Sequence, residues 1–176
     1  ESVQSFNLLF QTWIGPFNSE RAFLRPETAQ GIFTAFKRTF EAARRKLPLG
    51  IAQVGRVARN EISPRQSLIR MREFTIMEFE FFFDPGDVMP LPKEVADAEV
   101  RVKLTSGQLY AGAFGDALKK SYVANAWMAY FMYQTLRFMN ALGFSTDEIL
   151  FLEKGEKERA HYSSQTFDVM VPTKGW

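Results

Sequence analysis

Residues 55–83 constrain the fold most strongly, because they contain two runs with the period of a β-strand, separated by turn-forming residues. Side chains in a strand point alternately to opposite faces, so residues two positions apart share a face. The first run extends from Gly50 to Glu61, and the second begins near Ile69. Between them, residues 63–67 are rich in turn formers and poor in apolar side chains, which is typical of a hairpin loop longer than two residues. The pattern predicts a two-stranded antiparallel hairpin.

One face of this predicted hairpin is highly charged. The alternation places the following side chains on it: Arg59, Glu61, Arg70, Arg72, Phe74 and Glu78. Cross-strand ion pairs on a solvated face would explain the charges by themselves. The ring of Phe74 favours a nucleotide instead, since a base can stack on a ring while neighbouring guanidinium groups bind phosphates.

The opposite face of the hairpin is mostly apolar, and we expect it to pack on a core. It carries the following side chains, among which Glu73 is the exception: Met71, Glu73, Thr75, Met77, Phe79 and Phe81. The loop between the strands adds one more guanidinium group, Arg65.

The 176-residue chain is long enough to bury a core and falls within the size of one domain, with room for an insert. It contains no apolar run of about 18 residues and no charged-then-apolar leader, so we expect a soluble, cytoplasmic protein without a membrane segment. The absence of cysteine excludes disulfides and, with a single histidine, the usual zinc sites. A metal ion would therefore be a hard cation such as Mg2+, held by carboxylates and substrate phosphates.

The charges are distributed unevenly along the chain, although the net charge is only +2. Residues 21–72 hold 12 of the 22 basic side chains and 3 of the 20 acidic ones, so this segment carries +9 and the remainder −7. Such separation favours an anionic partner, either a polyphosphate or a nucleic acid. A solvated basic face is the alternative.

An amphipathic helix is predicted after Glu27, between Pro26 and Pro48. Its apolar positions recur at intervals of three and four: Ile32, Phe33, Phe36, Phe40, Ala43 and Leu47. Three cations, Arg44, Arg45 and Lys46, would occupy the last turn of this helix. There they complement the helix dipole, and we prefer this capping role to a contact with RNA.

Residues 87–149 are predicted to form a mainly helical insertion, and residues 1–86 and 150–176 a common core. The main helix of the insertion extends from about Val123 to Leu142 and ends at Gly143. Its large apolar side chains are assigned to packing: Trp127, Tyr130, Phe131 and Leu136. Ser145 and Glu148 can form a capping box, and strands are expected at residues 149–152 and 167–176.

Several blocks of the chain resemble the glycyl-tRNA synthetases of the dimeric type found in archaea, eukaryotes and some bacteria. The blocks are FNLLFQTWIGP (6–16), LRPETAQGIF (24–33), ARNEISPR (58–65), IRMREFTIMEFEFF (69–82) and ERAHYSSQTFD (158–168). The family belongs to the class II synthetases, so the resemblance implies an α+β fold in which helices flank an antiparallel catalytic sheet. In that fold a strand, loop and strand called motif 2 clamps ATP, and here it matches the predicted hairpin.

The resemblance implies an ATP site on the hairpin. The matching positions are Arg59, Asn60, Glu61, Ile69, Arg70, Met71, Arg72 and Phe74. Arg59 matches the arginine that contacts the α-phosphate, Glu61 an acidic residue that contacts ATP, and Phe74 the ring that stacks on adenine. Arg65 matches a loop position that contacts phosphate or the acceptor end of tRNA.

The resemblance also implies a glycine site, in which Glu27 and Glu78 surround the ammonium group. Arg25 and Gln30 are further candidates for orienting glycine. Selectivity must come from crowding that excludes a methyl group, because glycine has no side chain to grip. The implied reaction is attack of the glycine carboxylate on the α-phosphate of ATP, supported by Mg2+, followed by glycyl transfer to tRNA(Gly) by a homodimer. The carboxylate is already ionised at pH 7, so this step needs no protein base.

The family pattern also includes a motif 1, which supports the dimer interface, and a motif 3 arginine, which contacts the ATP phosphates. Neither has a match here, so we expect these 176 residues alone to be weak or inactive in glycylation. Two other classes stay open: a synthetase-like paralogue that does not charge tRNA, and a non-catalytic nucleotide- or RNA-binding module. Glu27 and Glu78 argue against the module, because an RNA binder gains nothing from carboxylates in a basic groove.

Overall fold

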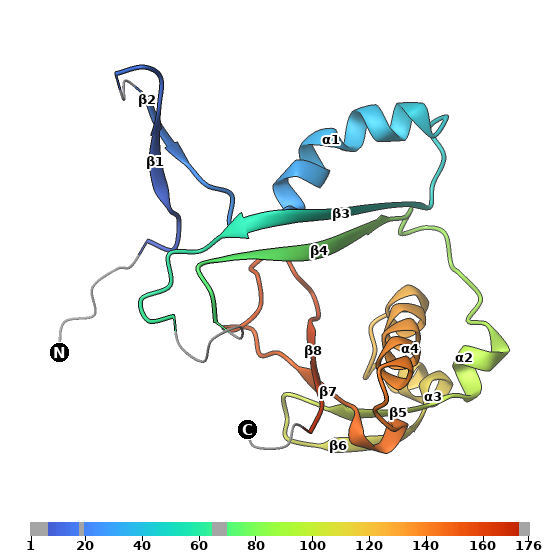
Figure 1. Ribbon diagram of the computed structural model, residues 1–176. Helices are drawn as coiled ribbons and strands as arrows, with labels where there is room; N and C mark the ends of the chain where they lie inside the picture. The colour runs from blue at the N-terminus through green and yellow to red at the C-terminus, as the bar shows by residue number, and fades with distance from the viewer. Residues whose placement is uncertain (1–6, 18–19, 65–69, 173–176) are drawn as a thin grey trace. The chain divides into compact units, whose positions relative to one another are not determined.

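The computed structural model describes residues 7–17, 20–64 and 70–172, and the chain forms two compact units (Figure 1). The first unit is Glu1–Asp87 and the second is Val88–Trp176. Both combine helices with strands, in agreement with the predicted α+β class. Among the described residues, no helix is both long enough and apolar enough to cross a bilayer.

The first unit is built on the predicted hairpin, which the structure confirms. Strands β3 (Leu49–Ala58) and β4 (Glu73–Phe82) pair antiparallel over their whole length, with Val57 opposite Phe74 and Gln53 opposite Glu78. Residues 65–69 of the loop lie outside the described residues. The strands are shorter at this end than predicted, so residues 59–61 and 70–72 lie beyond the regular ladder.

A smaller hairpin precedes these strands and is joined to the free edge of β3. Strands β1 (Gln11–Ile14) and β2 (Glu20–Phe23) pair antiparallel. Beyond them, the Ala58 amide donates to the Arg25 carbonyl, and the Asn60 amide donates to the Leu8 carbonyl, over 3.0 and 2.8 Å. The first bond holds the segment that leads into the next helix at the end of β3, and the second holds the segment that precedes β1 just beyond it.

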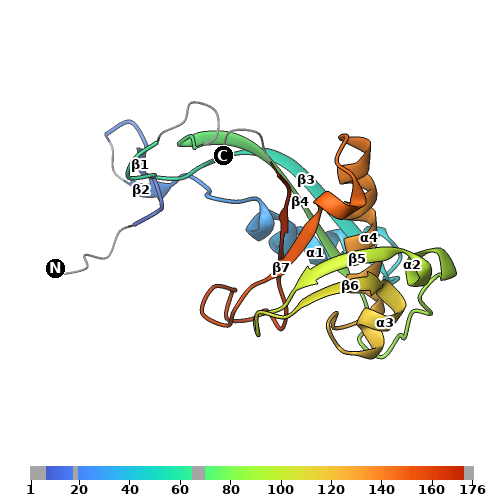
Figure 2. The same cartoon turned by 90° about the horizontal axis from the view of Figure 1, so that it is seen from below.

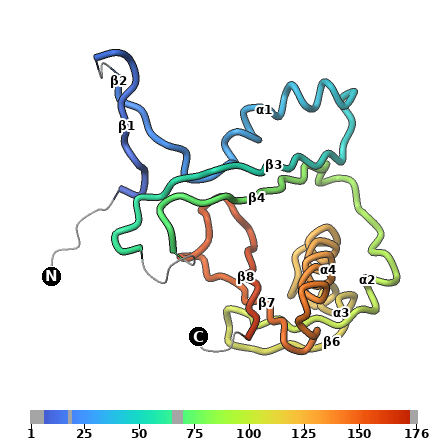
Figure 3. The backbone as a smooth tube through the Cα atoms, viewed as in Figure 1, coloured from blue at the N-terminus to red at the C-terminus, as the bar shows by residue number. Residues whose placement is uncertain are grey.

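Helix α1 (Ala29–Ala42) lies along the hairpin, as the tube in Figure 3 shows. Its buried residue is Ile32, and its aromatic side chains contact Phe82 of β4, whose ring centroid is 4.4 Å from that of Phe36 and 6.0 Å from that of Phe33. Phe82 shares a face with Glu78, because the two residues are four positions apart in one strand. Helix α1 therefore covers the face that the sequence predicted to be the charged one.

The opposite face of the hairpin is exposed within the described part of the chain. Val54, Met77 and Phe79 are 66%, 72% and 48% exposed. Within the first unit this apolar stripe is not the face that α1 covers, and the expectation that it packs on a core stays a prediction. The hydrophobic face of α1 packs against Phe82 on the other side of the sheet, and alternation alone does not say which face a helix will cover.

Helix α1 also ends earlier than predicted. It stops at Ala42, and Arg44 and Arg45 follow with φ angles of 58° and 55°. Their amides donate to the carbonyls of Glu41 and Phe40, so backbone groups close the helix. The prediction that Arg44, Arg45 and Lys46 occupy the last helical turn is wrong, because these left-handed residues turn the chain toward β3.

The second unit contains a four-stranded sheet with helices packed beside it. The elements in chain order are α2 (Lys93–Asp97), β5 (Glu99–Lys103), β6 (Leu109–Ala113), α3 (Phe114–Lys119), α4 (Ala126–Ala141), the 3-10 helix η1 (Thr146–Glu148), β7 (Leu150–Glu153) and β8 (Phe167–Met170). The strand order is β6-β5-β7-β8, and of these pairs only β5–β7 is parallel. Figure 2 shows β5 beside β6 in this sheet. The hydrophobic core of this second unit includes Val100, Val102, Phe114, Ile149 and Phe151.

Local signals in this unit are confirmed. Gly143 follows α4 with φ 101°, as predicted for a helix end. Asn125, which was not predicted, caps the start of α4 by accepting a 2.9 Å hydrogen bond from the Met128 amide. Ser145 and Glu148 form the predicted capping box. Each of these features depends on residues close together in the sequence.

The strand pairing of β7 differs from what the predicted division of the chain into a core and an insertion implies. Strand β7 pairs with β5, so residues 150–170 share a sheet with residues 99–113. The β5–β6 hairpin was not predicted within the helical segment. The assignment of residues 87–149 to an insertion and of residues 150–176 to a catalytic core stays a prediction.

Candidate functional site

Arg59 and Phe74 meet at the open end of the hairpin, on the face covered by α1. The Arg59 amide extends the ladder by donating to the Arg72 carbonyl over 2.8 Å. The Arg59 Nε donates to the Pro26 carbonyl over 3.1 Å, and its Cζ lies 5.4 Å from the centre of the Phe74 ring. The structure therefore brings together the predicted phosphate-binding arginine and the predicted stacking ring.

The neighbouring predicted residues hold this end of the hairpin together. The Arg72 Nε donates to the Glu61 carbonyl over 3.1 Å, and the Asn60 Nδ2 donates to the Asn7 carbonyl over 3.3 Å. Arg70 is exposed and Met71 is half-buried. The remaining predicted positions, Arg65 and Ile69, lie outside the described residues.

Carboxylates gather at the start of α1. Both the backbone amide and the hydroxyl of Thr28, which is only 1% exposed, donate to Glu78 Oε2. The Gln30 Nε2 donates to Glu27 Oε1. The positive end of the helix dipole favours anionic groups here, so the fold supports both carboxylates without a ligand.

A third carboxylate, Glu80, belongs to the same group and was missed as a candidate site residue. Burial raises the pKa of the Glu80 carboxyl above its ordinary value, and the negative charges of Glu78 and Glu27 raise it further. The signal that could have identified it is its position two residues after Glu78, which puts both side chains on one face.

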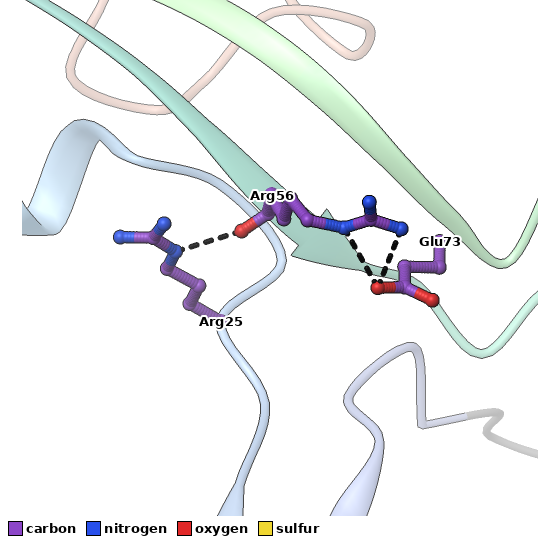
Figure 4. Close-up of polar contacts among 3 residues, drawn as sticks. All are labelled: Arg25, Arg56 and Glu73. Atoms are coloured by element: carbon purple, nitrogen blue, oxygen red, sulfur yellow. Dashed lines mark hydrogen bonds and ion pairs between the residues drawn. The ribbon is translucent and has the colours of Figure 1, made fainter.

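Arg25 lies on this face between the Arg59–Phe74 pair and the carboxylates at the start of α1. Its Nε donates to the Arg56 carbonyl over 2.8 Å, while the Arg56 side chain forms an ion pair with Glu73 (Figure 4). A Cβ atom on Gly55 would lie 2.5 Å from an Arg25 Nη and 3.2 Å from the Thr28 methyl group. Gly55 lies between the Val57 and Gln53 positions on its strand, so the Arg25 guanidinium lies between Phe74 and Glu78 along the face.

A hollow of about 480 Å³ lies beside this arrangement rather than over it. It is lined by Phe10, Leu24, Arg25, Arg56, Val57, Ala58, Arg72 and Glu73. It shares only Arg25 and Arg72 with the predicted site. We therefore define the candidate site by its converging charged groups and not by this largely apolar hollow.

The described residues contain no group of three or more His, Cys, Asp or Glu side chains that could hold a metal ion. They do not form a metal centre of their own.

Comparison with known proteins finds relatives that match nearly the whole chain. The chain is 49% identical to the glycine–tRNA ligase of Aeropyrum pernix, over 99% of its own length and 31% of the relative. It is 45% identical to that of Pyrococcus furiosus, over 99% of this chain and 32% of the relative, and 43% identical to that of Archaeoglobus fulgidus, over 97% and 30%. The chain thus spans about a third of these curated relatives, and the glycyl-tRNA synthetase resemblance is confirmed.

The family comparison covers most of the chain. Residues 13–173 match the model of the class II tRNA synthetase core domain for G, H, P, S and T. This range includes the hairpin with Arg59 and Phe74, the carboxylates at the start of α1 and nearly all of the second unit. The chain belongs to the class II tRNA synthetase core domain family.

Proposed function

We propose that this chain is the part of a glycine–tRNA ligase that binds ATP and glycine. In the first step, a glycine carboxylate oxygen bonds to the α-phosphorus of ATP, the bond to the β-phosphate bridging oxygen breaks, and pyrophosphate leaves. In the second step, glycyl-adenylate transfers its glycyl group to a terminal ribose hydroxyl of tRNA(Gly), and AMP leaves. The observation that carries the proposal is the order of groups on the α1-covered face: Phe74 and Arg59, then Arg25, then Glu78.

This order matches the parts of a glycyl-adenylate. We assign the adenine to the Phe74 ring and the α-phosphate to the Arg59 guanidinium, whose Nε is engaged by Pro26 so that its orientation is set. The glycine carbonyl end would lie near Arg25. Positive charge at these positions stabilises the negative charge that develops on phosphorus in the transition state.

The glycine ammonium group is assigned to the carboxylates at the start of α1. Glu78 is held by two hydrogen bonds from Thr28, and Glu27 is held by Gln30, so neither carboxylate needs to reorganise when a cation binds. Glu80 adds a third negative charge nearby. Exclusion of alanine would follow from the limited space beside these groups.

Mg2+, homodimerisation and a cytoplasmic location belong to the same proposal. The metal would supply charge neutralisation on the phosphates and would enter with ATP, because Mg2+ in such sites takes most of its ligands from substrate phosphates and water and only one or two from protein carboxylates. The dimer is proposed for the longer protein, whose relatives extend well beyond this chain. The cytoplasm is where a translation enzyme meets tRNA.

The test is calorimetric binding of glycyl-sulfamoyl-adenosine, a stable analogue of the adenylate, compared with its alanyl counterpart. We expect the glycyl compound to bind more tightly, and both Arg59→Ala and Glu78→Gln to weaken binding of both compounds, the latter through loss of the negative charge that faces the ammonium group. Arg137→Ala serves as a control, because it removes an exposed arginine from α4 in the other unit. Equal binding of both compounds, or no effect of Arg59→Ala, would contradict the assignment.

Binding of RNA without binding of the analogue would favour the non-catalytic module. Analogue binding by a full-length enzyme that leaves tRNA(Gly) uncharged would favour the paralogue. Glycylation of tRNA(Gly) by the 176 residues alone would contradict only the expectation that this part is weak or inactive by itself.

A further inference from the structure

The segment at the end of α1 carries a dense group of exposed cations that the proposed reaction does not use. We call it the α1-end cluster, and it consists of Lys37, Arg38, Arg44, Arg45 and Lys46, all exposed. One acidic residue, Glu41, lies among them. It forms a 3.7 Å ion pair with Arg45, and both side chains are solvated, so the pair neutralises little of the local charge.

Two members of the cluster occupy a backbone conformation that disfavours arginine. Arg44 and Arg45 have φ angles of 58° and 55°, in the left-handed region where glycine is the common residue at helix ends. A glycine at either position would adopt these angles without the clash between Cβ and the backbone. The chain thus retains guanidinium groups at two consecutive positions against a conformational preference.

The helix end does not explain these guanidinium groups. The last turn of α1 contains no basic residue, and backbone amides of residues 43–45 satisfy the carbonyls of Thr39, Glu41 and Phe40. The capping role favoured by the sequence pattern is therefore already filled by the backbone. The side-chain charge of Arg44 and Arg45 remains to be explained.

The position of the cluster excludes the ATP phosphates as its partner. It lies before the start of β3, whereas Arg59 follows the end of β3. Ten extended residues separate the two ends, which corresponds to about 33 Å at the usual rise per residue. A ligand that contacts both ends must be a long polyanion.

We propose that the α1-end cluster binds the phosphate backbone of RNA. The proposal rests on the proposed function, in which tRNA is a substrate and its acceptor end must reach Arg59. The chain's uneven charge supports it, because residues 21–72 combine the cluster with the arginines of the hairpin in a segment of charge +9. Phosphate contacts of this kind position an RNA without reading its sequence.

The test uses the double variant Arg44→Gly/Arg45→Gly and a fluorescently labelled tRNA(Gly) transcript, with anisotropy measured at several salt concentrations. We expect weaker binding and a slope of log Kd against log salt that falls by about one for each phosphate group that the variant no longer neutralises. The melting temperature should stay the same or rise, because glycine relieves the left-handed conformation. A melting temperature that is unchanged or higher would show that loss of affinity does not result from unfolding.

The matched control is Lys93→Ala/Arg137→Ala, which removes the same net charge from exposed positions of the second unit. Unchanged affinity and slope in the glycine double variant would overturn the proposal. An equal loss in the control would also overturn it, because net charge alone would then account for the effect. An unrelated RNA of equal length should show the same loss as tRNA(Gly), as expected for backbone contacts.

Binding of glycyl-sulfamoyl-adenosine separates failure of this inference from failure of the proposed function. The glycine double variant should bind the analogue as the unsubstituted chain does. If the analogue binds and RNA affinity is unchanged by the variant, the inference fails alone. If the analogue does not bind but the RNA effect is present, the proposed function fails and the RNA surface stands.

Discussion

Substitution of Gly55 by alanine tests whether the Arg25 guanidinium lies over the middle of the hairpin. The added Cβ would lie 2.5 Å from an Arg25 Nη, 3.3 Å from its Cζ and 3.2 Å from the Thr28 methyl group. The first distance is shorter than any tolerated contact, so Arg25 must move. Its 2.8 Å hydrogen bond to the Arg56 carbonyl would then be broken or distorted.

The expected change in the free energy of unfolding of Gly55→Ala is the difference between two opposing contributions. Loss of a hydrogen bond from a charged donor destabilises by about 1.5–3 kcal/mol, and by less where water can replace it, as at the exposed Arg25. Alanine in place of glycine reduces the entropy of the unfolded chain, which stabilises by roughly 0.5–1 kcal/mol. We therefore expect Gly55→Ala to lower the free energy of unfolding by about 1 kcal/mol.

The same substitution in an Arg25→Ala background provides the sharper test. Without the guanidinium group, the added methyl group meets only the Thr28 contact, so Gly55→Ala should become neutral or slightly stabilising. Urea unfolding of the four proteins of this double-mutant cycle should give a coupling energy of about 1–2 kcal/mol. Additive effects would refute the position assigned to Arg25, and with it the proposed role of Arg25 near the substrate carboxylate.

Three further substitutions test the carboxylate group and the second unit. Glu80→Gln should raise the free energy of unfolding at pH 7. Burial and the charges of Glu78 and Glu27 raise the pKa of Glu80, so its ionised form is less stable in the folded protein than in the unfolded chain. In urea titrations the gain in stability should shrink as the pH falls toward 4.5, and a gain that does not change with pH would contradict this explanation. Gln165→Ala should destabilise the second unit by roughly 1–3 kcal/mol in urea unfolding, since the Gln165 amide accepts from the Ala124 amide and donates to the Tyr122 carbonyl and the Glu153 carboxylate. Gln165→Glu should not recover this loss at pH 7, because its carboxylate would face the two acceptors without a donor, and recovery would contradict these contacts. Asn125→Ala should lower the melting temperature, because it removes a helix cap that contributes about 1 kcal/mol to stability. Asn125→Asp keeps an oxygen acceptor at the cap and should not lower it. An equal decrease of the melting temperature in both variants would exclude the cap as the cause.

Features with a local cause were predicted correctly from the sequence. The period of two identified β3 and β4, and the turn residues between them identified a hairpin. Gly143 after α4 and the Ser145–Glu148 spacing placed the end of that helix and the start of the next turn within a few residues. Such signals involve neighbours in sequence, so the interactions they represent form in almost any tertiary context.

The candidate site was predictable in part for a different reason. Arg59, Phe74, Glu27 and Glu78 were placed by motif resemblance, and the structure gathers them on one face of the hairpin. Glu80 and the position of Arg25 over Gly55 were not predicted. The position of Arg25 depends on how the loop before α1 folds back onto β3, a contact between residues about 30 positions apart, whereas Glu80 could have been identified from its spacing of two from Glu78.

The sequence by itself determined the strands of the hairpin, the main helices, the charge separation and the family to which the chain belongs. Tertiary structure alone decided which face of the hairpin α1 covers, where α1 ends, and that β7 pairs with β5 rather than with the hairpin. The physical reason is that the alternation of side chains assigns residues to two faces of the hairpin but does not determine which face is buried. That choice depends on the packing of Phe33, Phe36 and Phe82 and on backbone hydrogen bonds between distant segments, which no local pattern encodes.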